Sequence, residues 1–257
     1  MANTISMQRT GSVAIVTLNR TQKRNAMTLA MWKDLAALFR GLAAERDVRT
    51  IMLTGGETCF SAGADIGEFD AVRGTPELAH SYEDAVDGCC DAIASAPQVT
   101  MAAVYGPCMG GGCSLALACD FRLAHADAFF AIPAARLSIV YGVSSIRRLL
   151  ALTGLSFTRQ FLFGAQRIGA EEALQHGLAD LVSADPTSRA LAMAAELAQS
   201  APITVGATKE ILEALVQGWQ TADDIAARHF RTATLSDDYA EARAAFGQHR
   251  KPVFRGT

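Results

Sequence analysis

The stretch that decides the fold is GPCMGGGCSLALACD, residues 106–120, in which three successive glycines separate a predicted strand from a predicted helix. Residues 99–104 (VTMAAV) precede it and are almost wholly apolar, which is typical of a strand buried on both faces. Glycine lets a ligand approach the backbone closely, and the first amides of a helix have no partner within that helix. The stretch therefore predicts a strand–turn–helix unit with free backbone donors at its turn.

A second small-residue turn, FSAGADI at residues 60–66, follows another apolar run, TIMLT at residues 50–54. Two such turns that face each other would each donate one N–H to a single oxygen, which is the arrangement of an oxyanion hole. On its own, a triple glycine is more typical of a tight turn that is needed only for packing. Nucleotide-phosphate motifs do not fit, because no Lys-Ser/Thr follows the glycines and the GxGxxG spacing is absent.

Strands and helices alternate outward from these turns. Thr28 is expected to cap a helix, because apolar residues recur after it at helical spacing. The other predicted elements are strands at residues 13–18, 50–54, 99–104, 121–124 and 129–132 and helices at residues 76–95 and 113–119. This alternation indicates an α/β fold with buried strands.

The C-terminal part has a different pattern. Residues 187–247 are almost wholly helical in pattern, with breaks at Ala201-Pro202 and at Gly218. We therefore expect an α/β core over residues 1–195 and a C-terminal helical module over residues 196–257.

Composition narrows the function classes. The net charge of −3 lacks the basic excess of nucleic-acid-binding proteins. No apolar run reaches transmembrane length and residues 1–12 lack a signal-peptide core, so we expect a cytoplasmic protein with no nucleic-acid or membrane partner. The histidines and cysteines show no metal-ligand spacing, so we expect no metal site and free thiols. The cysteines are Cys59, Cys89, Cys90, Cys108, Cys113 and Cys119.

Five stretches together resemble motifs of the crotonase, or enoyl-CoA hydratase/isomerase, superfamily, in the same order along the whole chain. One departure is Thr21, which stands where the family usually has proline. The stretches are residues 19–27 (NRTQKRNAM), 60–66 (FSAGADI), 106–120 (GPCMGGGCSLALACD), 172–182 (EALQHGLADLV) and Phe246 with residues 250–254 (RKPVF).

The resemblance implies a crotonase-like spiral of ββα units, a C-terminal helical trimerisation module, and a homotrimer or hexamer. It places the oxyanion amides on Ala64 and Gly111, where they would stabilise the enolate of an acyl-CoA thioester. Coenzyme A is then part of the substrate, and no tightly bound cofactor is expected. The family's C-terminal lysine falls on His249, so Arg250 or Lys251 is its expected substitute. The residues matched to CoA contacts are Lys23, Arg24, Ala62, Asp65, Ile66, Phe230 and Lys251.

The chain departs from the family's hydratases at both catalytic glutamates. Their positions hold Ser114 and Ala134. A hydroxyl and a methyl group do not replace two carboxylates as acid and base. We therefore expect an enzyme of this family, a lyase or isomerase of fatty acid metabolism, that does not add water efficiently by the standard mechanism. The aspartate of the family's dienoyl isomerases would fall at Gly142 and is also absent.

Other side chains are candidates near the acyl group. Tyr141, in LSIVY at residues 137–141, resembles a tyrosine of the methylmalonyl-CoA decarboxylase branch, although a packed aromatic role is equally expected. Glu68, followed by Asp70 and Arg73, lies just after the first turn and offers a carboxylate. Three functions stay open: a hydratase/isomerase-family enzyme with other acid–base groups, a decarboxylase that uses Tyr141, and a non-catalytic acyl-CoA-binding protein.

Overall fold

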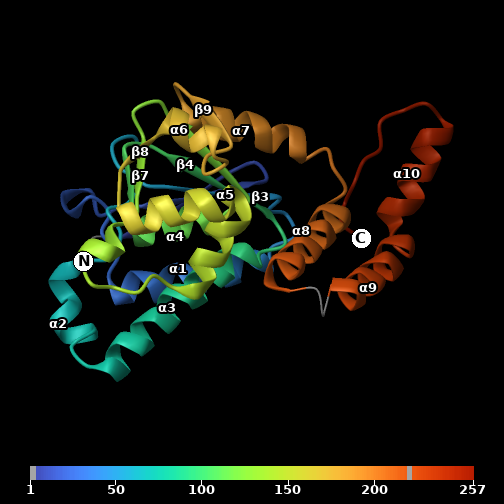
Figure 1. Ribbon diagram of the computed structural model, residues 1–257. Helices are drawn as coiled ribbons and strands as arrows, with labels where there is room; N and C mark the ends of the chain where they lie inside the picture. The colour runs from blue at the N-terminus through green and yellow to red at the C-terminus, as the bar shows by residue number, and fades with distance from the viewer. Residues whose placement is uncertain (1–3, 219–221) are drawn as a thin grey trace.

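The computed structural model describes residues 4–218 and 222–257, and its core is a six-stranded sheet (Figure 1). The strand order is β1-β2-β3-β4-β6-β9, with β1 antiparallel to β2 and every later neighbour parallel. Every residue of β3 and β4 is buried, as their apolar sequences predicted. The strands are β1 (Ile5–Thr10), β2 (Val13–Leu18), β3 (Thr50–Thr54), β4 (Val99–Val104), β6 (Phe121–His125) and β9 (Leu181–Ser183).

A second, three-stranded sheet gives the chain its spiral course. Its order is β5-β7-β8, from β5 (Pro107–Met109), β7 (Phe129–Ala131) and β8 (Ile168–Gly169). The chain passes from β4 in the large sheet to β5 in the small sheet and then into the buried helix α4 (Gly111–Ala118). It repeats the course through β6, β7 and a helical segment, so strand–strand–helix units follow one another as the resemblance implied.

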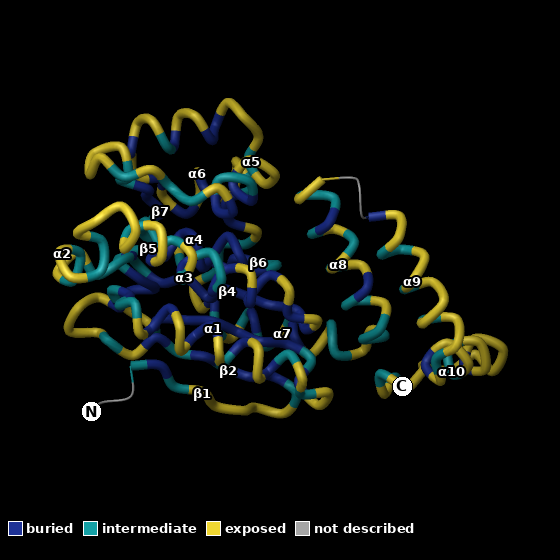
Figure 2. Tube along the Cα trace, turned by 90° about the horizontal axis from the view of Figure 1, so that it is seen from below, coloured by how far each residue is buried: buried dark blue, intermediate teal, exposed yellow. Residues whose placement is uncertain are grey.

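Helices cover both faces of the large sheet. The larger apolar cluster joins one face to α1 (Leu29–Ala43), α3 (Pro76–Ala94) and α4. The smaller cluster joins the other face to α7 (Pro186–Leu197), which packs through Ala190 and Ala194. Figure 2 shows the central strands and α4 as the buried centre of the molecule. The predicted cap is confirmed, because the Thr28 side chain accepts a hydrogen bond from the Met31 amide at the start of α1.

The last three helices stand to one side of this core (Figure 1). They are α8 (Pro202–Gln217), α9 (Ala222–Thr234) and α10 (Asp237–Gly247). The breaks predicted at Ala201-Pro202 and Gly218 are confirmed, and a further break lies between α9 and α10. The division after residue 195 stays a prediction. Helix α7 packs against the sheet and ends at Leu197, and Val205 of α8 packs against the same cluster.

Several elements were not predicted. The edge strand β1 is mostly exposed and polar, and α5 contains a kink at Gly154, where φ is 72°. The stretch after the first turn contains two short helical segments. None of the described helices is long and apolar enough to cross a membrane. The remaining elements are η1 (Thr21–Lys23), η2 (Ile66–Glu68), α2 (Phe69–Val72), η3 (Pro133–Arg136), α5 (Val143–Gly164) and α6 (Ala170–Gln175).

Candidate active site

The first small-residue turn is held in place by the segment that precedes α1. The Met27 amide donates to Gly63 O at 2.7 Å, and the Asp65 amide donates to Met27 O at 2.8 Å. The amide of Ala62 donates to Arg24 O at 2.9 Å. These bonds leave the Ala64 amide, between the two bonded positions, as a donor without a protein acceptor in the described chain.

Asn25 fixes the same turn from within the core. Its side chain is fully buried, and Nδ2 donates to Gly55 O at 2.9 Å, to Cys59 O at 2.8 Å and to Phe60 O at 3.3 Å. Its backbone φ is 53°, a left-handed conformation that asparagine tolerates better than most residues. Asn25, the second asparagine of the NRTQKRNAM stretch, therefore holds the turn that follows β3 in place.

The second turn is built against the first. The Met109 amide donates to Ser61 O at 2.9 Å, and the Ser61 amide donates to Pro107 O at 3.1 Å. Gly110, with φ 49° and ψ −115°, then turns the chain so that α4 begins at Gly111. The amide of Gly111 is the first of that helix, where donors lack intrahelical partners and the helix dipole favours negative charge.

The two turns approach each other closely. A Cβ atom added to Gly63 would lie 3.1 Å from the Gly111 nitrogen and 2.6 Å from Met109 O. A Cβ atom added to Gly111 would lie 3.5 Å from the Ala64 nitrogen and 2.8 Å from Cζ2 of Trp32. Side chains at these glycines would thus fill the space between the turns. The amide nitrogens of Ala64 and Gly111 both border this small space.

That space opens into a cavity of about 200 Å³. The residues singled out from the sequence that line it are Ala62, Ala64, Ile66, Arg73, Gly111, Ser114, Ala134, Tyr141 and Gly142. Its other walls come from α1, α2, α3 and the loop before α5, and they include Trp32, Phe69, Tyr82 and Glu83. A cavity with backbone donors on one wall and mainly apolar side chains elsewhere is typical of a site that binds the acyl part of a substrate.

Tyr141 and Ser114 form a hydrogen-bonded unit behind the second turn. The Tyr141 hydroxyl lies 2.6 Å from Ser114 Oγ and donates to Gly110 O at 3.0 Å. Because a phenol has one proton and the carbonyl can only accept, Ser114 is the donor to Tyr141 in this arrangement. Burial raises the pKa of Tyr141 well above its ordinary value, so its hydroxyl stays protonated. The pair holds Gly110, next to the Gly111 amide.

Glu68 lies elsewhere than expected. Its Oε1 accepts a hydrogen bond from the Leu29 amide at 2.6 Å, which caps the start of α1, and it is not among the residues that line the cavity. Arg73 does line the cavity, with Nη1 2.5 Å from Oε1 of Glu83. Sequence reasoning missed Glu83, Tyr82 and Trp32, because they lie on helices outside the recognised motifs.

Five residues matched to CoA contacts gather around the first turn. Asp65 pairs with Arg20, whose Nη1 lies 2.6 Å from Oδ2, and this hydrogen bond is the main cause that lowers the pKa of Asp65. Ile66 is 58% exposed at the edge of the cavity. Exposed Lys23 and Arg24 precede the segment bonded to this turn, so positive charge lies beside it. The five residues are Lys23, Arg24, Ala62, Asp65 and Ile66.

Phe230 and Lys251 are not brought to this cavity within one chain. Phe230 lies on α9 and is 69% exposed, and Lys251 follows α10. Figure 1 shows these helices on the opposite side of the core from α2, which borders the cavity. A contact of either residue with substrate would need a second copy of the chain.

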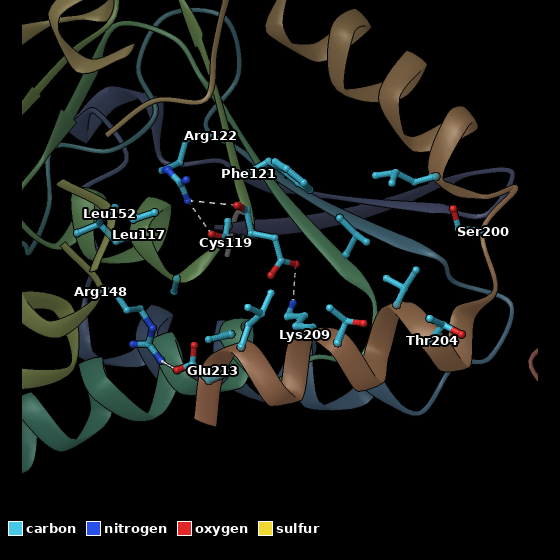
Figure 3. A pocket seen from close by; sticks show the side chains of 18 of the residues that line it. Leu117, Cys119, Phe121, Arg122, Arg148, Leu152, Ser200, Thr204, Lys209 and Glu213 are labelled. Carbon is cyan, nitrogen blue, oxygen red and sulfur yellow. Dashed lines mark hydrogen bonds and ion pairs between the residues drawn. The ribbon is translucent and has the colours of Figure 1, made fainter. Parts of the chain in front are cut away.

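A larger cavity, of about 750 Å³, lies between the core and α8 (Figure 3). Four of its charged side chains form two ion pairs across it, and Arg122 pairs with Asp180 outside it. Lys209 Nζ lies 2.7 Å from Asp120 Oδ2, and Arg148 Nη2 lies 2.9 Å from Glu213 Oε1. These pairs connect α8 to the core, and the lining lacks the two small-residue turns, so this cavity is not our candidate for the chemistry. No cluster of three or more metal-ligating side chains occurs in residues 4–218 and 222–257.

Comparisons with known proteins agree with the fold and the motifs. The chain is 32% identical over 255 residues to a probable enoyl-CoA hydratase of Mycobacterium bovis, covering 98% of this chain and 99% of that protein. It is 31% identical over 256 residues to a short-chain-enoyl-CoA hydratase of Clostridium acetobutylicum, covering 97% of this chain and 96% of that protein.

A crystal structure of a putative enoyl-CoA hydratase/isomerase family protein from Hyphomonas neptunium matches with a TM-score of 0.93 and 32% identity, covering 99% of this chain and 98% of that one. The crotonase-like α/β fold implied by the sequence is thereby confirmed. The sequence profile of the enoyl-CoA hydratase/isomerase family matches residues 8–257. The chain is therefore an enzyme that belongs to the enoyl-CoA hydratase/isomerase family.

Proposed function

We propose that the protein binds an acyl-CoA thioester with its carbonyl oxygen between the amides of Ala64 and Gly111, and that these amides stabilise the enolate formed there. The observation that carries the proposal is the close approach of two turns whose amides have no protein acceptor in the described chain. A preorganised donor of this kind typically lowers a barrier by about 3–4 kcal/mol. These donors would offset the negative charge that develops on the thioester oxygen.

The CoA portion is proposed to lie across the mouth of the cavity. Lys23 and Arg24 are exposed cations beside the first turn, and phosphate groups are their natural partners. Coenzyme A would enter and leave as part of the substrate, with no tightly bound cofactor. Phe230 and Lys251 would come from a neighbouring copy in a homotrimer or hexamer, and we propose a cytoplasmic role in fatty acid metabolism.

The reaction is proposed to be one that needs enolate stabilisation but not a pair of carboxylates at positions 114 and 134. Ser114 is buried and paired with Tyr141, and Ala134 offers only a methyl group. Neither side chain can activate a water molecule as a general base. Addition of water by the two-glutamate mechanism therefore has no support at this site.

A decarboxylase that uses Tyr141 as proton donor has less support than this proposal. The Tyr141 hydroxyl already donates its proton to Gly110 O. Burial raises the pKa of the phenol well above its ordinary value, which makes it a weaker acid. Release of carbon dioxide from methylmalonyl-CoA, abolished by Tyr141→Phe, would revive the decarboxylase. Binding of acyl-CoA without any turnover across a panel of thioesters would favour the non-catalytic alternative.

The amides can be tested by adding bulk where they meet. Gly111→Ala puts a methyl group between the turns, and its Cβ would lie 2.8 Å from Trp32. Deuterium incorporation next to the thioester carbonyl of butyryl-CoA in D₂O should slow by about 10²–10³-fold. Gly41→Ala is the matched control, because a Cβ atom at that helical position meets nothing within 4 Å. Equal rates in both variants would contradict the proposal.

A further inference from the structure

The cavity contains one carboxylate within the described chain. Of the residues that line it, Glu83 on α3 is the sole aspartate or glutamate. The two positions at which the family's hydratases carry glutamates hold Ser114 and Ala134. A group that accepts a proton from a bound acyl chain must therefore come from another element, and α3 supplies the one carboxylate in place.

The cavity's phenols are poor proton acceptors. Burial raises the pKa of Tyr82 to about 12 and that of Tyr141 well above its ordinary value. The Tyr82 oxygen accepts a hydrogen bond from Trp32 Nε1 at 3.0 Å, and Tyr141 is bonded to Ser114 and Gly110. Each phenol is thus protonated and already bonded, which leaves Glu83 as the candidate base.

Arg73 fixes the Glu83 carboxylate by one oxygen. Nη1 of Arg73 lies 2.5 Å from Oε1 of Glu83. The guanidinium is itself held over two rings, 5.0 Å from the Phe69 centroid and 5.1 Å from the Tyr82 centroid. Because the cation is fixed by packing and the Glu83 side chain is mostly buried, the carboxylate is held in one orientation.

The second oxygen of Glu83 faces the loop that ends in Gly142. A Cβ atom at Gly142 would lie 3.7 Å from Glu83 Oε2 and 3.1 Å from Asp87 Oδ1, so the absence of a side chain there leaves room beside Oε2. Asp87 Oδ1 is buried without a hydrogen-bond partner, and burial is the main cause that raises the pKa of Asp87. Asp87 does not line the cavity, so among the described lining residues Glu83 alone presents a carboxylate oxygen to bound substrate.

We propose that Glu83 is the catalytic residue that moves a proton at the carbon next to the thioester carbonyl, an inference that rests on the function proposed above. The C–H bond at this carbon breaks, its proton passes to Glu83 Oε2, and the electron pair delocalises onto the carbonyl oxygen. The amides of Ala64 and Gly111 stabilise that oxyanion. The protonated Glu83 then returns the proton to the same carbon or, in a 3-enoyl thioester, to the carbon at position 4. The cycle balances without water or another co-reactant, so a single carboxylate is sufficient.

The experiment measures deuterium incorporation into butyryl-CoA in D₂O by mass spectrometry, together with the Kd of butyryl-CoA by calorimetry. Glu83→Gln should slow incorporation by at least about 10²-fold. Its Kd should stay within about twofold, since the amide preserves the shape of the side chain. Asp84→Asn is the matched control, because it removes the same charge from the next residue of α3, whose side chain is 68% exposed. Its rate should equal that of the wild type.

A second variant guards against loss of folding. Glu83→Ala should be inactive alone and should regain part of its exchange rate when formate supplies a carboxylate in the vacated space. Arg73→Gln should lower the rate at saturating substrate without raising KM, because Arg73 orients Glu83 and does not bind the thioester. Wild-type exchange with unchanged exchange in Glu83→Gln would overturn this inference and leave the proposed function intact. Loss of binding together with exchange in Glu83→Gln would also overturn it, and absence of exchange in the wild type would overturn both proposals.

Discussion

Replacing Asn25 by alanine should both destabilise the protein and displace the Ala64 amide. The substitution removes the donor to Gly55 O, Cys59 O and Phe60 O, and it removes the acceptor of the Arg20 amide at 2.8 Å. All of these groups bond to the fully buried Asn25 side chain. Each buried polar group left without a partner costs about 1–3 kcal/mol of stability. Because stranded neighbours relax together, we expect a total of about 3 kcal/mol from the hydrogen bonds.

The backbone adds a second contribution. Asn25 has φ 53°, and alanine in this left-handed region costs about 1 kcal/mol more than asparagine or glycine. The free energy of unfolding should therefore fall by about 4 kcal/mol in Asn25→Ala and by about 3 kcal/mol in Asn25→Gly, which keeps the conformation available. At about 2–4 °C per kcal/mol, the Tm of Asn25→Ala should fall by about 8–16 °C.

The assay combines urea unfolding at one fixed protein concentration with deuterium exchange into butyryl-CoA well below each variant's Tm. The folded Asn25→Ala protein should exchange about 10²-fold more slowly, since a displacement of about 1 Å is enough for such a loss. An unfolding free energy within about 1 kcal/mol of the wild type, or a normal rate in the folded variant, would refute the assignment of Asn25 as the support of the first turn.

Three further outcomes follow from the same contacts. Glu68→Ala should lower the unfolding free energy by about 1 kcal/mol through loss of the cap on Leu29 and should keep the exchange rate within about threefold; a hundredfold loss in a stable variant would return Glu68 to the catalytic group. The hydrogen bond from Arg20 lowers the pKa of Asp65, so its stabilisation is present above the unfolded pKa of about 4 and is lost as pH falls through the folded pKa. Asp65→Asn should consequently have a lower unfolding free energy than the wild type in urea at pH 7. The difference between the two proteins should shrink below about pH 4, and a difference that did not shrink would contradict a role for the Arg20–Asp65 pair. Burial raises the pKa of Cys90 and of Cys119 to about 12, so at pH 8 both thiols should react with a disulfide reagent only after unfolding, and rapid labelling of the native protein would show that these sites open.

The strands and the two turns were predictable because their signals are local. A buried parallel strand needs apolar residues at every position, and residues 50–54 and 99–104 supply them without reference to the rest of the chain. The edge strand β1 was missed because it pairs on one side only, so its exposed polar residues carry no such pattern. The kinked α5 was missed because Gly154 interrupts its helical pattern.

The proton-transfer group was not predictable for a different reason. Glu83 lies in the middle of α3, with Asp84 and Asp87 close by in the sequence, and nothing local separates them. Which of the three faces the cavity depends on how α3 packs against α1 and on the position of Arg73, and both are tertiary facts. Glu68 was favoured instead because it follows a recognised motif, although its position suits the cap of α1 better than the cavity.

The turns are specified locally, whereas the position of Glu83 depends on tertiary packing. This contrast suggests how one framework can support different reactions. The turns that present Ala64 and Gly111 are held by backbone hydrogen bonds, by Asn25 and by the Ser114–Tyr141 pair on Gly110. None of these contacts needs a carboxylate at position 114 or 134. The oxyanion donors thus keep their geometry when both glutamates are absent. A carboxylate from any wall of the cavity can then move the proton, provided that a partner such as Arg73 fixes it. If Glu83 has this role, transferring only Glu83 and Arg73 to a relative that lacks its own glutamates should confer exchange, whereas transferring Glu83 alone should not, because an unfixed carboxylate is not held at the reacting carbon.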